Sequence, residues 1–157
     1  MAIKFSIDKH AIAFPSKVLA GHGGEHNINL RITADRDNGV IRGVGSYIAF
    51  DEYEEANAPQ AFAGVIREQA ANGHWYVEIT NPADAAWIYT PEVIAETYDE
   101  RFKDMANFYN EKGKTVHAYI LHKMDIIELS DLGFSGTPKE GKSVTADATT
   151  GKLVVGN

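Results

Sequence analysis

The chain has 157 residues, of which 44% are hydrophobic and 24% charged, and it carries a formal net charge of −7. This length is enough for one domain, or for two small ones that share a core. The acidic balance argues against binding to nucleic acids or to anionic membranes, and the lack of cysteine excludes disulfides, thiolate zinc sites and cysteine nucleophiles. Since neither a membrane span nor a signal-peptide core is visible, we expect a soluble protein made in the cytoplasm.

Residues 1–25 are predicted to form an apolar arm ahead of the folded body. Apolar residues alternate with polar ones from Ile3 to Ile7, as in a short strand. The rest of the segment lacks the turn signals of a compact hairpin, so it can pack on the body or on a partner. The residues that we expect to contact a partner are Phe5, Phe14, Val18 and Leu19.

A first β-hairpin is predicted at the start of a β-rich body that spans residues 26–90. Polar and apolar residues alternate over 27–33, and Asn38-Gly39 is a preferred pair for a tight turn. The return strand is expected over 40–50, where Gly43 and Gly45 indicate a bulge or a close approach of another backbone segment. The acidic stretch 51–59 is predicted to be a solvated connection.

A second hairpin is predicted around Asn72-Gly73, with strands over 62–69 and 74–80. Aromatic residues recur here, and Trp75 and Trp87 suggest an alternative function as a stacking platform for a sugar. They alternate with core positions, so packing explains at least half of the aromatic residues.

An amphipathic helix is predicted at about 91–112. Pro91 is suited to the first helical position, Thr90 to the N-cap and Gly113 to the position after the C-cap. A face of this helix is apolar, and we expect it to pack on the core rather than to bind a cofactor. Its residues are Ile94, Tyr98, Phe102, Met105, Phe108 and Tyr109.

The predicted fold class is therefore α+β and mainly β, with short antiparallel strands that form a small barrel or sandwich. Further short strands are expected after the helix, ending in a last hairpin around 149–151. Residues 91–157 combine the helix with a barrel-like region, which we expect to share one core with residues 26–90.

One string has the form of a catalytic metal motif. His22-Gly23-Gly24-Glu25-His26 matches H-x-x-E-H, which binds zinc only when both histidines lie on one helix face. The two glycines disfavour a helix, and a strand pattern begins directly afterwards. We therefore expect a loop with no metal or cofactor, and incidental metal capture by His22 and His26 is an alternative to it. A metallohydrolase that uses His22, Glu25 and His26 is the third hypothesis for the function.

No other sequence motif forms a complete catalytic or ligand-binding site. The chain has no phosphate-binding glycine loop and no G-x-S-x-G elbow. The stretch after Asp35 lacks the ligands that a calcium loop needs. The sequence therefore predicts a protein that is not an enzyme.

The C-terminal third of the chain resembles a family of phage structural proteins. The resemblance rests on apolar strands and turn glycines, and it has Met124 where the family pattern has glycine. The matching elements are Phe108-Tyr109-Asn110, Lys112-Gly113-Lys114, Ala118-Tyr119-Ile120-Leu121, Asp125-Ile126-Ile127, Phe134, Gly136-Thr137-Pro138, Gly141-Lys142 and Gly151-Lys152-Leu153-Val154-Val155. They are similar to the C-terminal part of decoration, cement and head-fibre-like proteins, which tailed bacteriophages encode beside the major capsid protein.

This resemblance implies a structural role in the virion without catalytic residues. The chain is expected to bind the outer surface of a capsid, with the major capsid protein as partner, and to stabilise contacts between capsomers. It also implies many copies on the lattice or a homo-oligomer. A ligand- or carbohydrate-binding β-module, or another virion component, is the alternative.

Overall fold

The computed structural model describes residues 4–5, 9–15, 17–18, 27–50, 52–90 and 108–156, with only the backbone of residues 4–5. These residues are mainly β, and a 3-10 turn, η3 (Asp131–Gly133), is the helical element among them. The strands are β1 (Lys4–Phe5), β2 (Ala13–Phe14), β3 (Asn27–Arg31), β4 (Ile41–Ala49), β5 (Glu52–Ala56), β6 (Ala63–Gln69), β7 (Trp75–Asn81), β8 (Ala86–Ile88), β9 (Phe108–Tyr109), β10 (Thr115–Ile120), β11 (Ile126–Leu129), β12 (Phe134–Ser135), β13 (Ser143–Ala146) and β14 (Leu153–Val155).

Five strands close into a small barrel in the order β10-β3-β5-β4-β8. The pairs are antiparallel except for β3 with β5, which run parallel. The barrel confirms the mainly β, barrel-forming part of the predicted architecture. Alternating residues point into its centre and form a buried apolar cluster of Leu30, Ile32, Val40, Ala86, Ile88, Val116 and Ala118.

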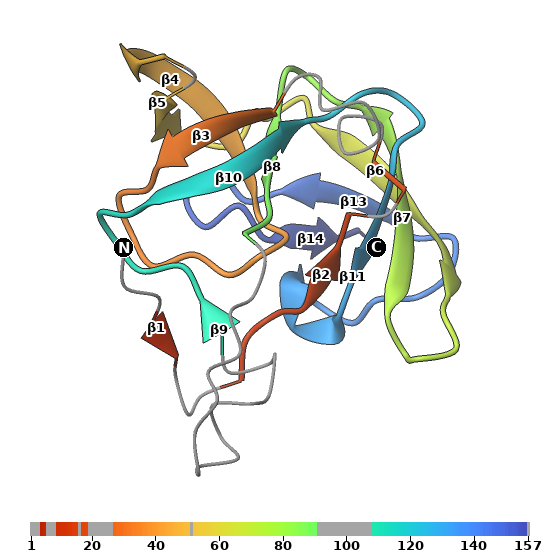
Figure 1. Ribbon diagram of the computed structural model, residues 1–157. Coiled ribbons are helices and arrows are strands. Elements are labelled where there is room, and N and C mark those ends of the chain that lie inside the picture. The colour runs from red at the N-terminus through yellow and green to blue at the C-terminus, as the bar shows by residue number, and fades with distance from the viewer. Residues whose placement is uncertain are drawn as a thin grey trace, which may run out of the picture.

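A second, curled sheet has the order β12-β14-β13-β6-β7-β11-β2 and lies beside the barrel (Figure 1). Its inner side builds the larger core, which includes Phe62, Ile79 and Leu129. Strand β8 contributes to both clusters because its residues alternate in direction: Ala86 and Ile88 pack inside the barrel, and Trp87 packs in the larger core.

The strand pairing predicted for the first hairpin is wrong. Strand β5 lies between β3 and β4, so the segments on either side of Asn38-Gly39 are not neighbours in the barrel. Asn38 is buried, and its side chain exchanges hydrogen bonds with the backbone of Thr90, at 2.8 and 2.9 Å. The stretch predicted to be a solvated acidic connection forms β5 instead.

Other local predictions are confirmed. Strands β6 and β7 form the hairpin predicted around Asn72-Gly73, where Gly73 has a φ of 89°. The last hairpin is the β13–β14 pair. The bulge expected from the glycines of β4 is present as a register shift against β5 between Val44 and Tyr47.

The predicted helix is not confirmed. Residues 91–107 lie outside the described part of the chain, but the expected C-terminal end of the helix is extended. Phe108 and Tyr109 form β9, which pairs with β1. Asn110 bridges to Arg36 through backbone hydrogen bonds of 2.7 and 2.8 Å. At residues 108–110 these tertiary bonds outweigh the helical periodicity of the sequence, whose preference is weak.

Candidate partner-binding surface

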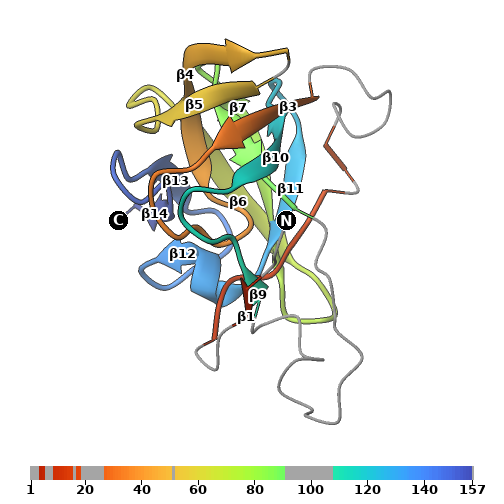
Figure 2. The same cartoon turned by 60° about the vertical axis from the view of Figure 1, so that its left-hand side comes forward.

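The most exposed apolar surface of the described residues lies on the hairpin formed by β4 and β5. Strand β4 starts inside the barrel, where residues 41–43 are buried, and then leaves it. Figures 1 and 2 show the hairpin extending beyond the barrel at the top of both views. On this projecting part Tyr47 is 65% exposed and Phe50 is 85% exposed, while Val44 is 36% exposed.

The tip of the hairpin is supported from one side. The ring of Tyr47 packs edge-on against Tyr53 of β5, with 5.7 Å between the ring centroids. Tyr53 in turn packs against the apolar cluster of the barrel. The exposed Tyr47 ring is therefore held against the body, whereas Phe50 lies in the turn with most of its surface in solvent.

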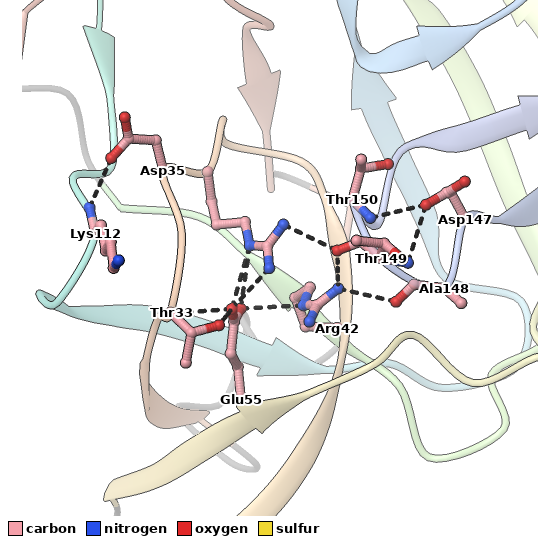
Figure 3. A network of polar contacts seen from close by, with 10 residues as sticks. Thr33, Asp35, Arg42, Glu55, Lys112, Asp147, Ala148, Thr149 and Thr150 are labelled. Atoms are coloured by element: carbon pink, nitrogen blue, oxygen red, sulfur yellow. Dashed lines mark hydrogen bonds and ion pairs between the residues drawn. The ribbon is translucent and has the colours of Figure 1, made fainter.

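A buried ionic network fixes the base of the same hairpin (Figure 3). The carboxylate of Glu55 on β5 accepts hydrogen bonds from Arg36 at 2.8 Å and from Arg42 on β4 at 3.0 Å. It also accepts bonds from the backbone N–H and the hydroxyl of Thr33, at 3.0 and 2.8 Å. The Glu55 side chain is fully buried and that of Arg42 is 3% exposed, so solvent screens these contacts little.

Both guanidinium groups continue the network to the turn between β13 and β14. Arg36 and Arg42 donate to the carbonyl oxygen of Thr149, at 3.0 and 2.7 Å, and Arg42 also reaches that of Ala148 at 3.2 Å. The turn itself is closed by Asp147, which accepts hydrogen bonds from the backbone N–H groups of Thr149 and Thr150. The network thus joins the hairpin to a turn that is distant in the sequence.

Electrostatics keep the central carboxyl group charged. Burial raises the pKa of Glu55, but the hydrogen bonds from Arg36 and Thr33 outweigh it, so the pKa lies below its usual range. Burial lowers the pKa of Arg42, and the Arg36 cation acts in the same direction, while Glu55 opposes them. Hydrogen bonds from the backbone of Thr150 and Thr149 lower the pKa of Asp147.

The segment predicted as a partner-binding arm is tied to the body where it is described. Val18 is fully buried in the larger core, and Phe14 stacks on His74 with 5.4 Å between ring centroids. Strand β2 extends the curled sheet beside β11. The backbone of Phe5 lies in β1, and Leu19 falls outside the described residues.

Two open cavities of about 330 and 290 Å³ flank this N-terminal segment, and His10 borders both. The polar side chains there contact the segment or one another. His10 contacts Asp37, His74 contacts Glu128 at 3.0 Å, and the hydroxyl of Ser130 accepts a hydrogen bond from the N–H of Ile12 at 2.8 Å.

The remaining candidates for chemistry form no site among the residues that the structure describes. His22, Glu25 and His26 lie outside the described residues, and within those residues no group of three or more histidine, aspartate or glutamate side chains is arranged for a metal. Trp87 is fully buried, so its ring cannot stack on a sugar from solvent. Trp75 is half-buried and donates its indole N–H to Asp131 at 2.7 Å.

The sequence did not identify the projecting hairpin as a site. Its apolar residues follow the pattern of an ordinary strand, and exposure depends on where the barrel ends. In the part of the chain that the structure describes, no helix has the length and apolarity needed to span a membrane. Comparison with protein-family models, with curated proteins and with solved structures gives no match to the chain.

Proposed function

We propose that the chain is a non-enzymatic decoration protein that binds the outer surface of a tailed-phage capsid and stabilises contacts between capsomers. The observation that carries this proposal is the β4–β5 hairpin, with its exposed aromatic tip on a buried base. Tyr47 and Phe50 are residues of the kind that anchor protein interfaces. Tyr47 lies on β4 and Phe50 lies in the turn that follows it, and the network around Glu55 holds the base of this hairpin in place. A fixed base lowers the entropic cost of ordering the two side chains on a partner.

The partner in this proposal is the major capsid protein, and many copies of the chain bind its repeating lattice. If the chain forms an oligomer, simultaneous contacts add avidity without a large single interface. The resemblance of residues 108–155 to decoration proteins supports the same role. Met124 has a φ of 75°, a conformation that favours glycine, at the position where the family pattern has glycine.

Binding to capsids tests the proposal directly. Purified protein is mixed with empty expanded capsids of the phage whose genome encodes it, sedimented, and located on the particles by electron microscopy. We expect stoichiometric binding to the outer surface. Failure of the wild-type protein to sediment with these capsids contradicts the proposal.

A pair of variants tests the role of the tip. Phe50→Ser removes the most exposed aromatic side chain, and we expect it to weaken capsid binding about tenfold or more, as for the loss of an interface anchor. Leu132→Ser is the matched control because Leu132 is also an exposed apolar residue, 45% accessible, but lies on η3. Its binding should equal that of the wild-type protein.

A further inference from the structure

Among the described residues, the outer edge of β4 has no strand partner along the projecting part of the hairpin. Strand β4 pairs with β8 only through Ile41 and Arg42, so from Gly43 to Ala49 this edge has no strand partner among the described residues. The other backbone hydrogen bonds within the described ranges do not involve this stretch. Such an edge presents unpaired N–H and C=O groups to any extended chain that approaches it.

This edge has register shifts between Val44 and Tyr47 and between Tyr47 and Ala49, but it lacks three other features that usually prevent strand pairing. Natural sheets protect their edges with very short strands, charged residues or proline. The two ends of the curled sheet follow that rule, since β2 and β12 have two residues each. The free part of β4 is longer, and between Gly43 and Ala49 it has neither charged residues nor proline.

Charge decides which kind of chain fits this edge. Residues 43–56 carry no lysine or arginine, and their acidic residues are Asp51, Glu52, Glu54 and Glu55. Glu55 is neutralised inside the base and Glu52 is paired with Arg31, but Glu54 is exposed. Edge-to-edge pairing of two copies would bring like charges together, whereas a basic segment is attracted.

We propose that the outer edge of β4 from Gly43 to Ala49 accepts an extended segment of the major capsid protein as an added β-strand. In this segment basic side chains alternate with apolar ones, so that one face meets the carboxylates and the other packs on Val44 and Tyr47. The capsid origin of the strand rests on the proposed function, but the pairing capacity of the edge does not.

Peptide binding tests the edge without capsids. The probe is the synthetic peptide KVKIKVKT. Two further forms carry methyl groups on alternate backbone nitrogens: one is methylated at all four lysines, and the other at the four remaining residues. Successive N–H groups of a strand point to opposite edges, so each form blocks one edge. One methylated form should lose affinity about tenfold or more, and the other should bind like the parent peptide. If the two methylated forms bind with the same affinity, or lose the same affinity relative to the parent peptide, the proposal is overturned. It is also overturned if the acidic peptide EVEIEVET binds as tightly as KVKIKVKT.

Hydrogen exchange on the particle tests the origin of the strand. In capsid-bound protein, the amides of residues 43–49 should exchange about tenfold or more slowly than in free protein. The edge strand β12 serves as the internal control and should be unchanged. Capsid binding without slower exchange over 43–49 overturns this inference and leaves the proposed function standing. Absence of capsid binding overturns both the proposed function and the capsid origin of the strand. In that case the peptide experiment alone decides whether the edge of β4 accepts an added strand.

Discussion

At the base of the β4–β5 hairpin Arg42 and Glu55 lie buried in a network of charged hydrogen bonds, whereas at its tip Tyr47 and Phe50 are exposed to solvent. The base places polar groups where apolar ones are usual, and the tip does the reverse. A buried ion pair contributes little net stability, but breaking it is expensive because the remaining charge has no partner. The base therefore fixes the direction of the strands, and the tip is left free to bind.

The largest effect should follow from breaking the base. Glu55→Gln removes the charge that compensates Arg36 and Arg42, and we expect the free energy of unfolding to fall by about 3–5 kcal/mol in urea titrations. Capsid binding should weaken as well, because the strands that carry the tip lose their anchor. The neighbouring Glu54→Gln is the control: Glu54 is exposed, and its replacement should change stability by less than about 0.5 kcal/mol. Equal stabilities of the two variants would refute the structural role of the network.

Acid should weaken the base in the same way. The pKa of Glu55 is lowered in the folded protein, so its stabilising effect is complete above the unfolded value of about 4.3 and is lost as the pH falls through the lower folded value. The difference in unfolding free energy between the wild type and Glu55→Gln should therefore shrink below about pH 4. Other carboxyl groups such as Asp147 titrate in both proteins, so their contributions cancel in the difference between the two unfolding free energies. A difference that is constant between pH 7 and pH 3 would contradict this assignment.

A smaller loss of stability should come from the N-terminal segment, without an effect on the tip. Val18→Ala removes two methyl groups from a fully buried position, and we expect it to lower the free energy of unfolding by about 2 kcal/mol. Capsid binding below the unfolding transition should be unchanged, because Val18 packs in the larger core and not on the hairpin. Weaker capsid binding by folded Val18→Ala protein would instead favour the original prediction that this segment contacts the partner.

The sequence predicts strand pairings between neighbouring segments of the chain better than pairings between distant ones. The β6–β7 hairpin was predictable because its turn glycine and its alternation lie close together in the chain. The order of β3, β5 and β4 was not, since the parallel β3–β5 pair joins segments whose local pattern suits several partners. Likewise, the helical periodicity that ends at Tyr109 gives no sign of the bridge between Asn110 and Arg36.

The candidate site was hidden from the sequence for a related reason. Glu55 stands in an acidic stretch that resembles a solvated loop, and its partners Arg36 and Arg42 lie 19 and 13 residues away. Only the closed barrel brings them together. Tyr47 and Phe50 match an ordinary strand and turn, and their exposure arises because β4 continues beyond its pairing with β8.

The smallest effect is a gain in stability at a position distant in the sequence from both ends of the hairpin. Met124 has a φ of 75° and a side chain that is 71% exposed, so it bears left-handed strain with little burial in return. Met124→Gly should raise the free energy of unfolding by about 0.5–1 kcal/mol, since relief of strain exceeds the greater freedom of glycine in the unfolded chain. Met124→Ala keeps the strain and loses only the side chain, so it should be close to neutral. If the alanine variant were as stable as the glycine variant, strain would not be the cause. If Met124→Gly weakened capsid binding, the tip of β4 and β5 would not be the sole contact, because the exposed Met124 side chain would then also touch the partner.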